Sequence, residues 1–440
     1  MNKRYSISTF AALAAVTLLA VYSTIQNCDP TRFARGLRFD NEEDEKYVDD
    51  KNFRVVSFGT SRAWGSGLQD PSTQTYTALL NGTNKAIRAS MADYPAMCTY
   101  SMLGDEVYDI ITIEYLPQSY NDCKDNLVEL GRRLRQRYPD ALIIYINVWS
   151  NHQFSVTLPD DTQGYLRTLI AERKLNDENI TLADVASDLQ YANRWEFQAS
   201  SEAWLREQLK DPSIRAEVLH YDLPNKDNYV SSIIKLSTLY LGDLTHFNEY
   251  GHRWVASEIR KIVREKQHTR KNTVNAWSNK DSCESWIQSG KSKVTTNMAM
   301  VPFSNGAKFA LESSKGRMKK FNASNYFVLE NDSDKDQHFY LSHMASGPNN
   351  TYGDGLVQIY EVGLEFPASY NVTVDTAADW ATYQIHIIKH DYIGKIKPGT
   401  SYVVVENKDV NFGWNFRTVG YIMSPTPHAV KNLHGELERR

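Results

Sequence analysis

Cysteine is scarce in this chain, with four among 440 residues, and no two of them stand at the short spacing of a metal-ligand pair. This absence disfavours a zinc site, and we expect neither a metal nor a cofactor. An excess of charge is also lacking, since the formal net charge is −4. A chain so nearly balanced in charge does not predict nucleic acid as a partner.

What the chain does have is a globular composition, with 41% hydrophobic and 23% charged residues. Its length fits two domains of ordinary size. Tyrosine and tryptophan are abundant, at 26 and 9 residues. Aromatic side chains suit both packed cores and carbohydrate-binding surfaces, so their number alone does not choose between the two.

The N-terminus has the pattern of a targeting segment. Lys3 and Arg4 precede an uncharged stretch, residues 7–25, whose most apolar part is short for a membrane span. We therefore expect residues 1–26 to be either a signal peptide, cleaved near Thr24, or a retained signal anchor with its basic end in the cytosol. The rest of the chain is then secreted, or is the lumenal or extracellular part of a type II membrane protein.

Cysteines and sequons both fit the secretory pathway. In an oxidising compartment we expect Cys98 to pair with Cys123, because both lie in the first domain, although free buried thiols are the alternative. Asn-X-Ser/Thr sequons predict a glycosylated surface. These sequons begin at Asn81, Asn179, Asn322, Asn331, Asn349 and Asn371.

The chain divides by composition. Residues 27–50 are acidic and polar, which is typical of a solvated stem. A first domain is predicted over 51–266, and a polar, basic linker over 267–282. Short alternating runs of β-branched and aromatic residues then predict an all-β, sandwich-like domain over 283–425. Residues 426–440 are predicted to form a tail.

The first domain has the pattern of an α/β fold. Its apolar runs at 53–58, 108–115 and 141–149 are nearly continuous, as parallel strands covered on both faces should be. Between the last two runs, leucines recur at helical spacing over 127–138, so that strand, helix and strand form a βαβ unit. A further helix is predicted around 251–266.

A serine follows the first predicted strand. Gly59 allows the chain to leave the strand sharply, and Ser61 in the turn then lies at the carboxyl edge of the sheet, where ligand sites of open α/β sheets collect. A serine nucleophile needs a base. His246 supplies one, because it precedes the last helix and follows Asp243 by three residues, which lets the carboxylate orient the imidazole.

The stretches "FGTSRAWGSG" and "DLTHFNEYGH" resemble the first and last sequence blocks of the SGNH, or GDSL-like, hydrolases. The resemblance covers about residues 50–265. It implies a flavodoxin-like three-layer α/β/α fold and ester hydrolysis. It also implies Ser61 as nucleophile, His246 as base and Asp243 as the residue that orients it.

The family's oxyanion hole is matched less well. Its second block places a glycine where this chain has Ala92, and its third block places an asparagine where this chain has Gln118 or, as the rival, Asn121. The resemblance therefore implies an oxyanion hole made of the Ser61 N–H, the backbone near Ala92, and a side-chain amide from one of the last two residues.

The function expected from these features is that of a secretory-pathway serine esterase. Its substrate would be an O-acyl ester, with an O-acetyl carbohydrate preferred. Two alternatives stay open, a non-catalytic glycan- or partner-binding protein and an acyltransferase that uses the same triad. Near the site, Arg62 is expected to be a solvated side chain or to steer an anion, Glu114 to be a structural hydrogen-bond partner, and His252 to be a packing residue.

Overall fold

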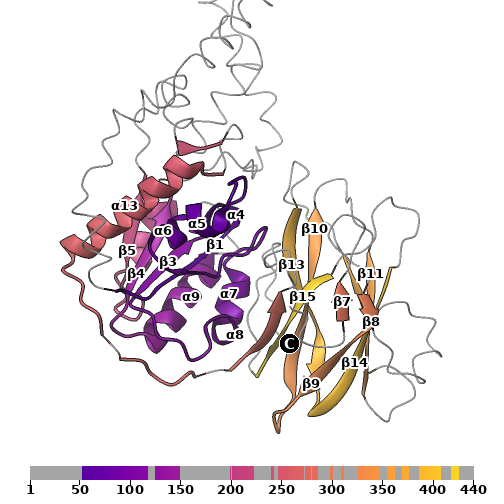
Figure 1. The fold of residues 1–440 in the computed structure, drawn as a ribbon. Helices are drawn as coiled ribbons and strands as arrows, with labels where there is room; N and C mark the ends of the chain where they lie inside the picture. Colours follow the sequence, from indigo (N-terminus) through magenta and orange to yellow (C-terminus); the bar gives the residue numbers. More distant parts are fainter. Residues whose placement is uncertain are drawn as a thin grey trace, which may run out of the picture.

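The structure is a computed structural model (Figure 1). It describes residues 52–116, 124–148, 199, 201–221, 239–241, 246–271, 273–278, 280–285, 298–300, 309–311, 326–346, 354–361, 369–375, 386–407 and 418–425. The predicted targeting segment, stem and tail lie outside these residues. Within the described ranges, none of the helices combines the length and apolarity needed to cross a bilayer.

The first domain is built on a five-stranded parallel sheet of order β2-β1-β3-β4-β5. Its strands are β1 (Val55–Gly59), β2 (Thr83–Asn84), β3 (Ile110–Glu114), β4 (Leu142–Asn147) and β5 (Glu217–His220). Three of these match the predicted apolar runs. The strand order is that of flavodoxin-like sheets, which confirms the expected fold class.

Helices cover both faces of this sheet (Figure 1). The labelled helices are α4 (Ser61–Trp64), α5 (Pro71–Gln74), α6 (Tyr76–Leu79), α7 (Asp93–Met97), α8 (Thr99–Leu103), α9 (Lys124–Arg137) and α13 (Glu249–Glu265), and residues 201–208 are also helical. Alternate strand residues point to opposite faces. Thus Ile110 shares a core with Val255 of α13, while Ile111 shares another with Leu130 of α9.

The second domain contains two four-stranded antiparallel sheets. One has the order β13-β10-β15-β6 and the other β12-β11-β14-β9, and a separate pair is formed by β7 and β8. The strands are β6 (Ser282–Ser285), β7 (Met298–Met300), β8 (Phe309–Leu311), β9 (Tyr326–Asn331), β10 (Gln337–Ser346), β11 (Gly355–Glu361), β12 (Tyr370–Val374), β13 (His386–Ile396), β14 (Gly399–Asn407) and β15 (Thr418–Ser424). Phe339 and Leu341 of one sheet share a core with Val357 and Val403 of the other, which confirms the sandwich.

The sheet containing β10 and β13 is also buried on its outer side. Tyr340 and Ile388 belong to the same apolar cluster as Tyr94 and Met97 of α7. At this contact the backbone N–H of Ile388 donates to the carbonyl oxygen of Ala89 at 2.9 Å. The two domains therefore meet through a core-like surface beside α7 and α8 (Figure 1).

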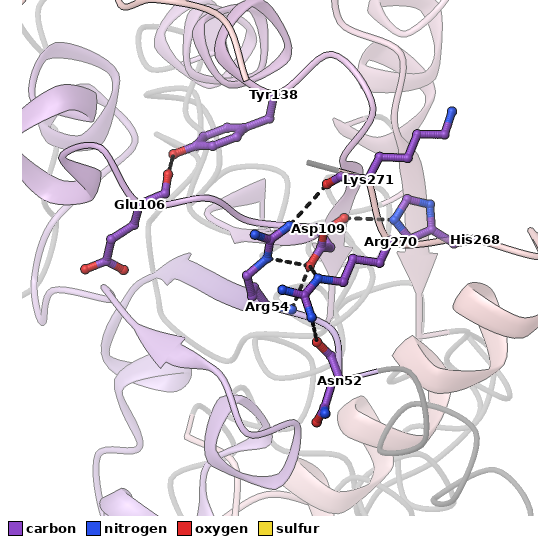
Figure 2. A network of polar contacts seen from close by, with 8 residues as sticks. All are labelled: Asn52, Arg54, Glu106, Asp109, Tyr138, His268, Arg270 and Lys271. Carbon is purple, nitrogen blue, oxygen red and sulfur yellow. Dashed lines mark hydrogen bonds and ion pairs between the residues drawn. The ribbon is translucent and has the colours of Figure 1, made fainter. Parts of the chain in front are cut away.

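The first part of the predicted linker, residues 268–271, is bound to the first domain. Figure 2 shows Arg54 and Arg270 directed at the buried carboxylate of Asp109, with His268 and Lys271 alongside. His268 Nε2 lies 3.0 Å from the Asp109 carbonyl oxygen, and the Arg54 guanidinium donates to the Lys271 carbonyl at 3.1 Å. The predicted division of the chain at residues 266 and 283 stays a prediction, but residues 268–271 are anchored at the amino edge of the sheet.

One disulfide crosses the domain boundary. Cys98, between α7 and α8, is bonded to Cys283 of β6 across a sequence separation of 185. The predicted pairing of Cys98 with Cys123 is therefore wrong, and Cys123 itself lies outside the described residues. Asp281 secures the same junction, since its carboxylate accepts hydrogen bonds from the backbone N–H groups of Tyr100 and Ser101.

One predicted glycosylation site is also wrong. The Asn331 side chain is 3% exposed, and its amide donates to the carbonyl oxygens of Lys335 and Ile396, each at 2.9 Å. An amide nitrogen that is buried and engaged in this way has no room for a glycan. Asn81 and Asn371 are exposed and stay predictions. Asn179, Asn322 and Asn349 lie outside the described residues.

Candidate active site

Ser61 lies in the turn that leaves the first strand. β1 ends at Gly59, Thr60 caps α4, and Ser61 is the first residue of that short helix. A side chain at position 59 would not fit, because an added Cβ would lie 2.5 Å from the Ala63 Cβ. The turn closes at Gly65, whose φ of 92° favours glycine. The sequence thus places the hydroxyl at the carboxyl edge of the sheet, as predicted.

His246 reaches the serine from the other end of the domain. Its Nε2 lies 2.9 Å from Ser61 Oγ, although 185 residues separate the two. With the imidazole proton on Nδ1, Nε2 accepts the hydroxyl hydrogen, which is the geometry a general base needs. The histidine is held by a bridge between Tyr240 and Phe247 and by the N–H of Leu241, which donates to its carbonyl at 2.8 Å.

Asn248 holds the segment that carries His246 at the start of the next helix. Asn248 caps α13, and its Oδ1 accepts the backbone N–H of Gly251 at 2.9 Å. The side-chain amide of Asn248 also donates to the carbonyl of Tyr240 at 3.1 Å. These bonds fix the short segment that carries the imidazole. Asp243 lies outside the described residues, so its orienting role stays a prediction.

The predicted oxyanion donors are only partly described. Ala92 is buried, at the N-cap of α7, with backbone torsions of −67° and −15° that do not require glycine. An alanine is thus compatible with the backbone at this position. Gln118 and Asn121 lie outside the described residues. The composition of the oxyanion hole stays a prediction.

Arg62 is not the solvated or anion-steering side chain that the sequence predicted, and it forms a buried ion pair with Glu114. Arg62 is fully buried and is therefore neither solvated nor free to steer a substrate. Its Nε lies 2.8 Å from Glu114 Oε1, and Glu114 Oε2 accepts the Thr60 hydroxyl at 2.8 Å and the Thr60 N–H at 3.1 Å. Glu114 is thus a hydrogen-bond partner, as predicted, but also one member of a buried ion pair.

A carboxylate–histidine pair, made by Glu202 and by His220 at the end of β5, was not predicted from the sequence. Glu202 accepts a hydrogen bond from the Asn147 amide at 2.7 Å and contacts His220 and Arg206. Burial opposes ionisation of Glu202, but hydrogen bonds from His220, Asn147 and Arg206 outweigh it and lower its pKa to about 2. Glu202 lies in a region whose helical pattern carried no functional motif, so no sequence signal pointed to this pair.

His252 is a packing residue, as expected. Its Nδ1 accepts the backbone N–H of Tyr76 at 3.2 Å, and its ring lies against Tyr76 and Phe247. The residue is fully buried. Burial lowers the pKa of His252 to about 3, so the imidazole is neutral in the folded protein.

The lowered pKa of His252 predicts acid sensitivity. Between its ordinary value of 6.5 and about 3, the unfolded chain binds a proton that the folded protein does not. The free energy of unfolding therefore falls as pH drops below about 6.5, by up to about 1.4 kcal/mol per pH unit from this group. We expect His252→Asn, whose Oδ1 can accept the Tyr76 N–H, to be less acid-sensitive in urea unfolding measured at several pH values. An unchanged pH slope in the variant would contradict this.

No protein-family model matches the chain, and no curated protein is significantly similar to it. Solved structures are similar at low identity. A two-domain esterase active on acetylated mannans, crystallised with mannopentaose, is 12% identical with a TM-score of 0.45, over 86% of this chain and 92% of its own. The psychrotrophic esterase EstA from Pseudoalteromonas sp. is 11% identical with a TM-score of 0.32, over 49% and 99%.

A GDSL-like lipase from Bacteroides thetaiotaomicron is also similar, at 12% identity and a TM-score of 0.29, over 54% of this chain and 98% of its own. The fold of the present chain rests on its own sheet order, and its candidate site on the contact between Ser61 and His246. Both agree with the SGNH resemblance of the sequence.

Proposed function

We propose that the protein is a serine esterase of the SGNH type that cleaves an O-acyl ester. The observation that carries the proposal is the 2.9 Å separation of Ser61 Oγ from His246 Nε2 at the carboxyl edge of a flavodoxin-like sheet. A serine hydroxyl becomes an effective nucleophile when a base accepts its proton as it attacks.

The reaction follows from this pair. Ser61 Oγ attacks the ester carbonyl carbon while His246 Nε2 takes the hydroxyl proton, and the imidazolium then protonates the departing alcohol. Water, deprotonated by the same imidazole, hydrolyses the acyl-enzyme and restores the serine. Asp243 would orient the imidazole, and the Ser61 N–H, the Ala92 region and an amide from Gln118 or Asn121 would stabilise the oxyanion.

We propose an acetylated carbohydrate as the substrate, outside the cell or in the lumen of the secretory pathway. The uncharged N-terminal stretch and the exposed sequons at Asn81 and Asn371 support this location. Attachment to a membrane depends on whether the N-terminal segment is retained.

A fluorophosphonate probe tests the nucleophile directly, because Ser61 Oγ would displace fluoride and keep the phosphonyl group. We expect mass spectrometry of the labelled protein to find one adduct, on the peptide containing Ser61. Acetate release from acetylated mannan, the substrate class of the similar two-domain esterase, would test the substrate. A folded protein that forms no adduct and hydrolyses neither p-nitrophenyl acetate nor butyrate would refute the proposal, and would favour binding without turnover.

A further inference from the structure

Glu114 is a buried carboxylate close to the turn that holds Ser61. It is the last residue of β3, and its side chain is fully buried, as is that of its ion-pair partner Arg62. Glu114 therefore contacts both sequence neighbours of Ser61, Thr60 and Arg62. Glu114 binds Thr60 through one carboxylate oxygen, and the other lies beside the Arg62 guanidinium.

A third contact closes this arrangement. Thr60 Oγ1 donates to Glu114 and also accepts the backbone N–H of Arg62 at 3.3 Å, so that one hydroxyl links the strand end to the residue after Ser61. The residues before and after the serine are therefore held by the same carboxylate. Because the backbone on both sides of Ser61 is fixed, the direction of its Cα–Cβ bond is fixed as well.

Stability alone does not account for a buried ion pair at this position. Removing two charges from water is unfavourable, and apolar side chains of similar volume often stabilise a protein as well or better. Catalysis has a stricter need, since a misplacement of about 1 Å in a reacting group can lower the rate about 10²-fold. The position of Ser61 Oγ must be held this accurately, because the hydroxyl has to remain within hydrogen-bond reach of His246.

We propose that Glu114 is a positioning residue that acts through Thr60 and Arg62 to hold Ser61 Oγ in line with His246 Nε2. The proposal rests on the function proposed above. It assigns Glu114 a role in the rate of acylation and none in substrate binding. Substitution of Glu114 should therefore lower kcat and leave KM nearly unchanged.

The chain offers a matched control on the same strand. Asp109 directly precedes β3, as Glu114 ends it, and its carboxylate is likewise buried and accepts the Arg54 guanidinium at 2.7 and 2.8 Å. Asp109→Asn and Glu114→Gln are the same chemical change at opposite ends of one strand. Only Glu114 lies at the edge of the sheet where β1 runs into the turn that holds Ser61.

The experiment compares these two variants with Thr60→Val and Thr60→Ser. With p-nitrophenyl acetate we expect Glu114→Gln to lower kcat about 10²-fold while KM changes by less than about 3-fold. Thr60→Val should also lower kcat, and Thr60→Ser, which keeps the hydroxyl, should restore most of it. Asp109→Asn should lower stability in urea and leave kcat unchanged. Equal kcat in wild type, Glu114→Gln and Thr60→Val, or an equal loss in Asp109→Asn, would overturn the proposal.

Crystal structures separate this proposal from the function on which it rests. If the wild type forms no fluorophosphonate adduct and hydrolyses no ester, the esterase assignment fails, but the position of Ser61 can still be measured. We then expect the Ser61 Oγ to His246 Nε2 distance to exceed hydrogen-bond length in Glu114→Gln or Thr60→Val. The same distance as in the wild type in both variants would refute the positioning role.

Discussion

Replacing Ser61 with alanine is expected to lower kcat for p-nitrophenyl acetate by about 10⁴- to 10⁶-fold, which is the largest effect we predict for any single change. The alanine removes the atom that forms the acyl-enzyme, so His246 is left without its partner at 2.9 Å. The remaining rate would reflect only oxyanion stabilisation and substrate binding.

The measurement is a steady-state rate with the purified variant, after urea unfolding has shown that it is as stable as the wild type. Ser66→Ala is the matched control, because it makes the same change in the same turn on a residue that has no described contact with His246. We expect Ser66→Ala to retain full activity. Comparable losses in both variants would indicate that the turn, and not the Ser61 hydroxyl, had been damaged.

Removing the interdomain disulfide is expected to have the second-largest effect, on stability. The chain-entropy model gives about 5 kcal/mol for a disulfide that closes a loop as long as the separation of 185 residues between Cys98 and Cys283. We therefore expect the double variant Cys98→Ala/Cys283→Ala to unfold at a markedly lower urea concentration. The Asp281 hydrogen bonds and the apolar contact beside α7 remain in that variant.

Cys123→Ala serves as the control for this experiment. Peptide mapping under non-reducing conditions should recover the Cys98–Cys283 peptide pair from both the wild type and Cys123→Ala. Recovery of Cys98 joined to Cys123 would contradict the observed pairing. An unchanged urea midpoint in the double variant, with the disulfide mapped in the wild type, would show that the other contacts at the junction suffice.

Local patterns predicted much of this molecule. The runs that became β1, β3 and β4 are apolar on both faces, and the leucines of α9 recur at helical spacing, so neighbouring residues alone determine these elements. Ser61 and His246 could be joined because each stands at a recognisable boundary, one after the first strand and one before the last helix.

Contacts between distant residues could not be predicted in the same way. Nothing near Arg62 in the sequence indicates that it is buried. Its partner Glu114 ends β3, and only the pairing of β3 with β1 brings Glu114 to the turn that contains Arg62. The pairing of Cys98 was wrong for a related reason, since sequence proximity favoured Cys123 while the docking of the second domain selected Cys283. Asn331 has the pattern of an acceptor site, but the pattern does not report burial.

The burial of the β10–β13 sheet against the first domain limits how recombination can change this gene. Tyr340, Ile388 and Ile422 belong to one apolar cluster with residues of the first domain. We therefore do not expect the sandwich to be transferable to another protein by itself. A shuffling event that moved it to another enzyme would expose an apolar face, and exposed faces of this kind promote aggregation. The two domains are therefore expected to be inherited together, with substitutions on one side of the contact compensated on the other.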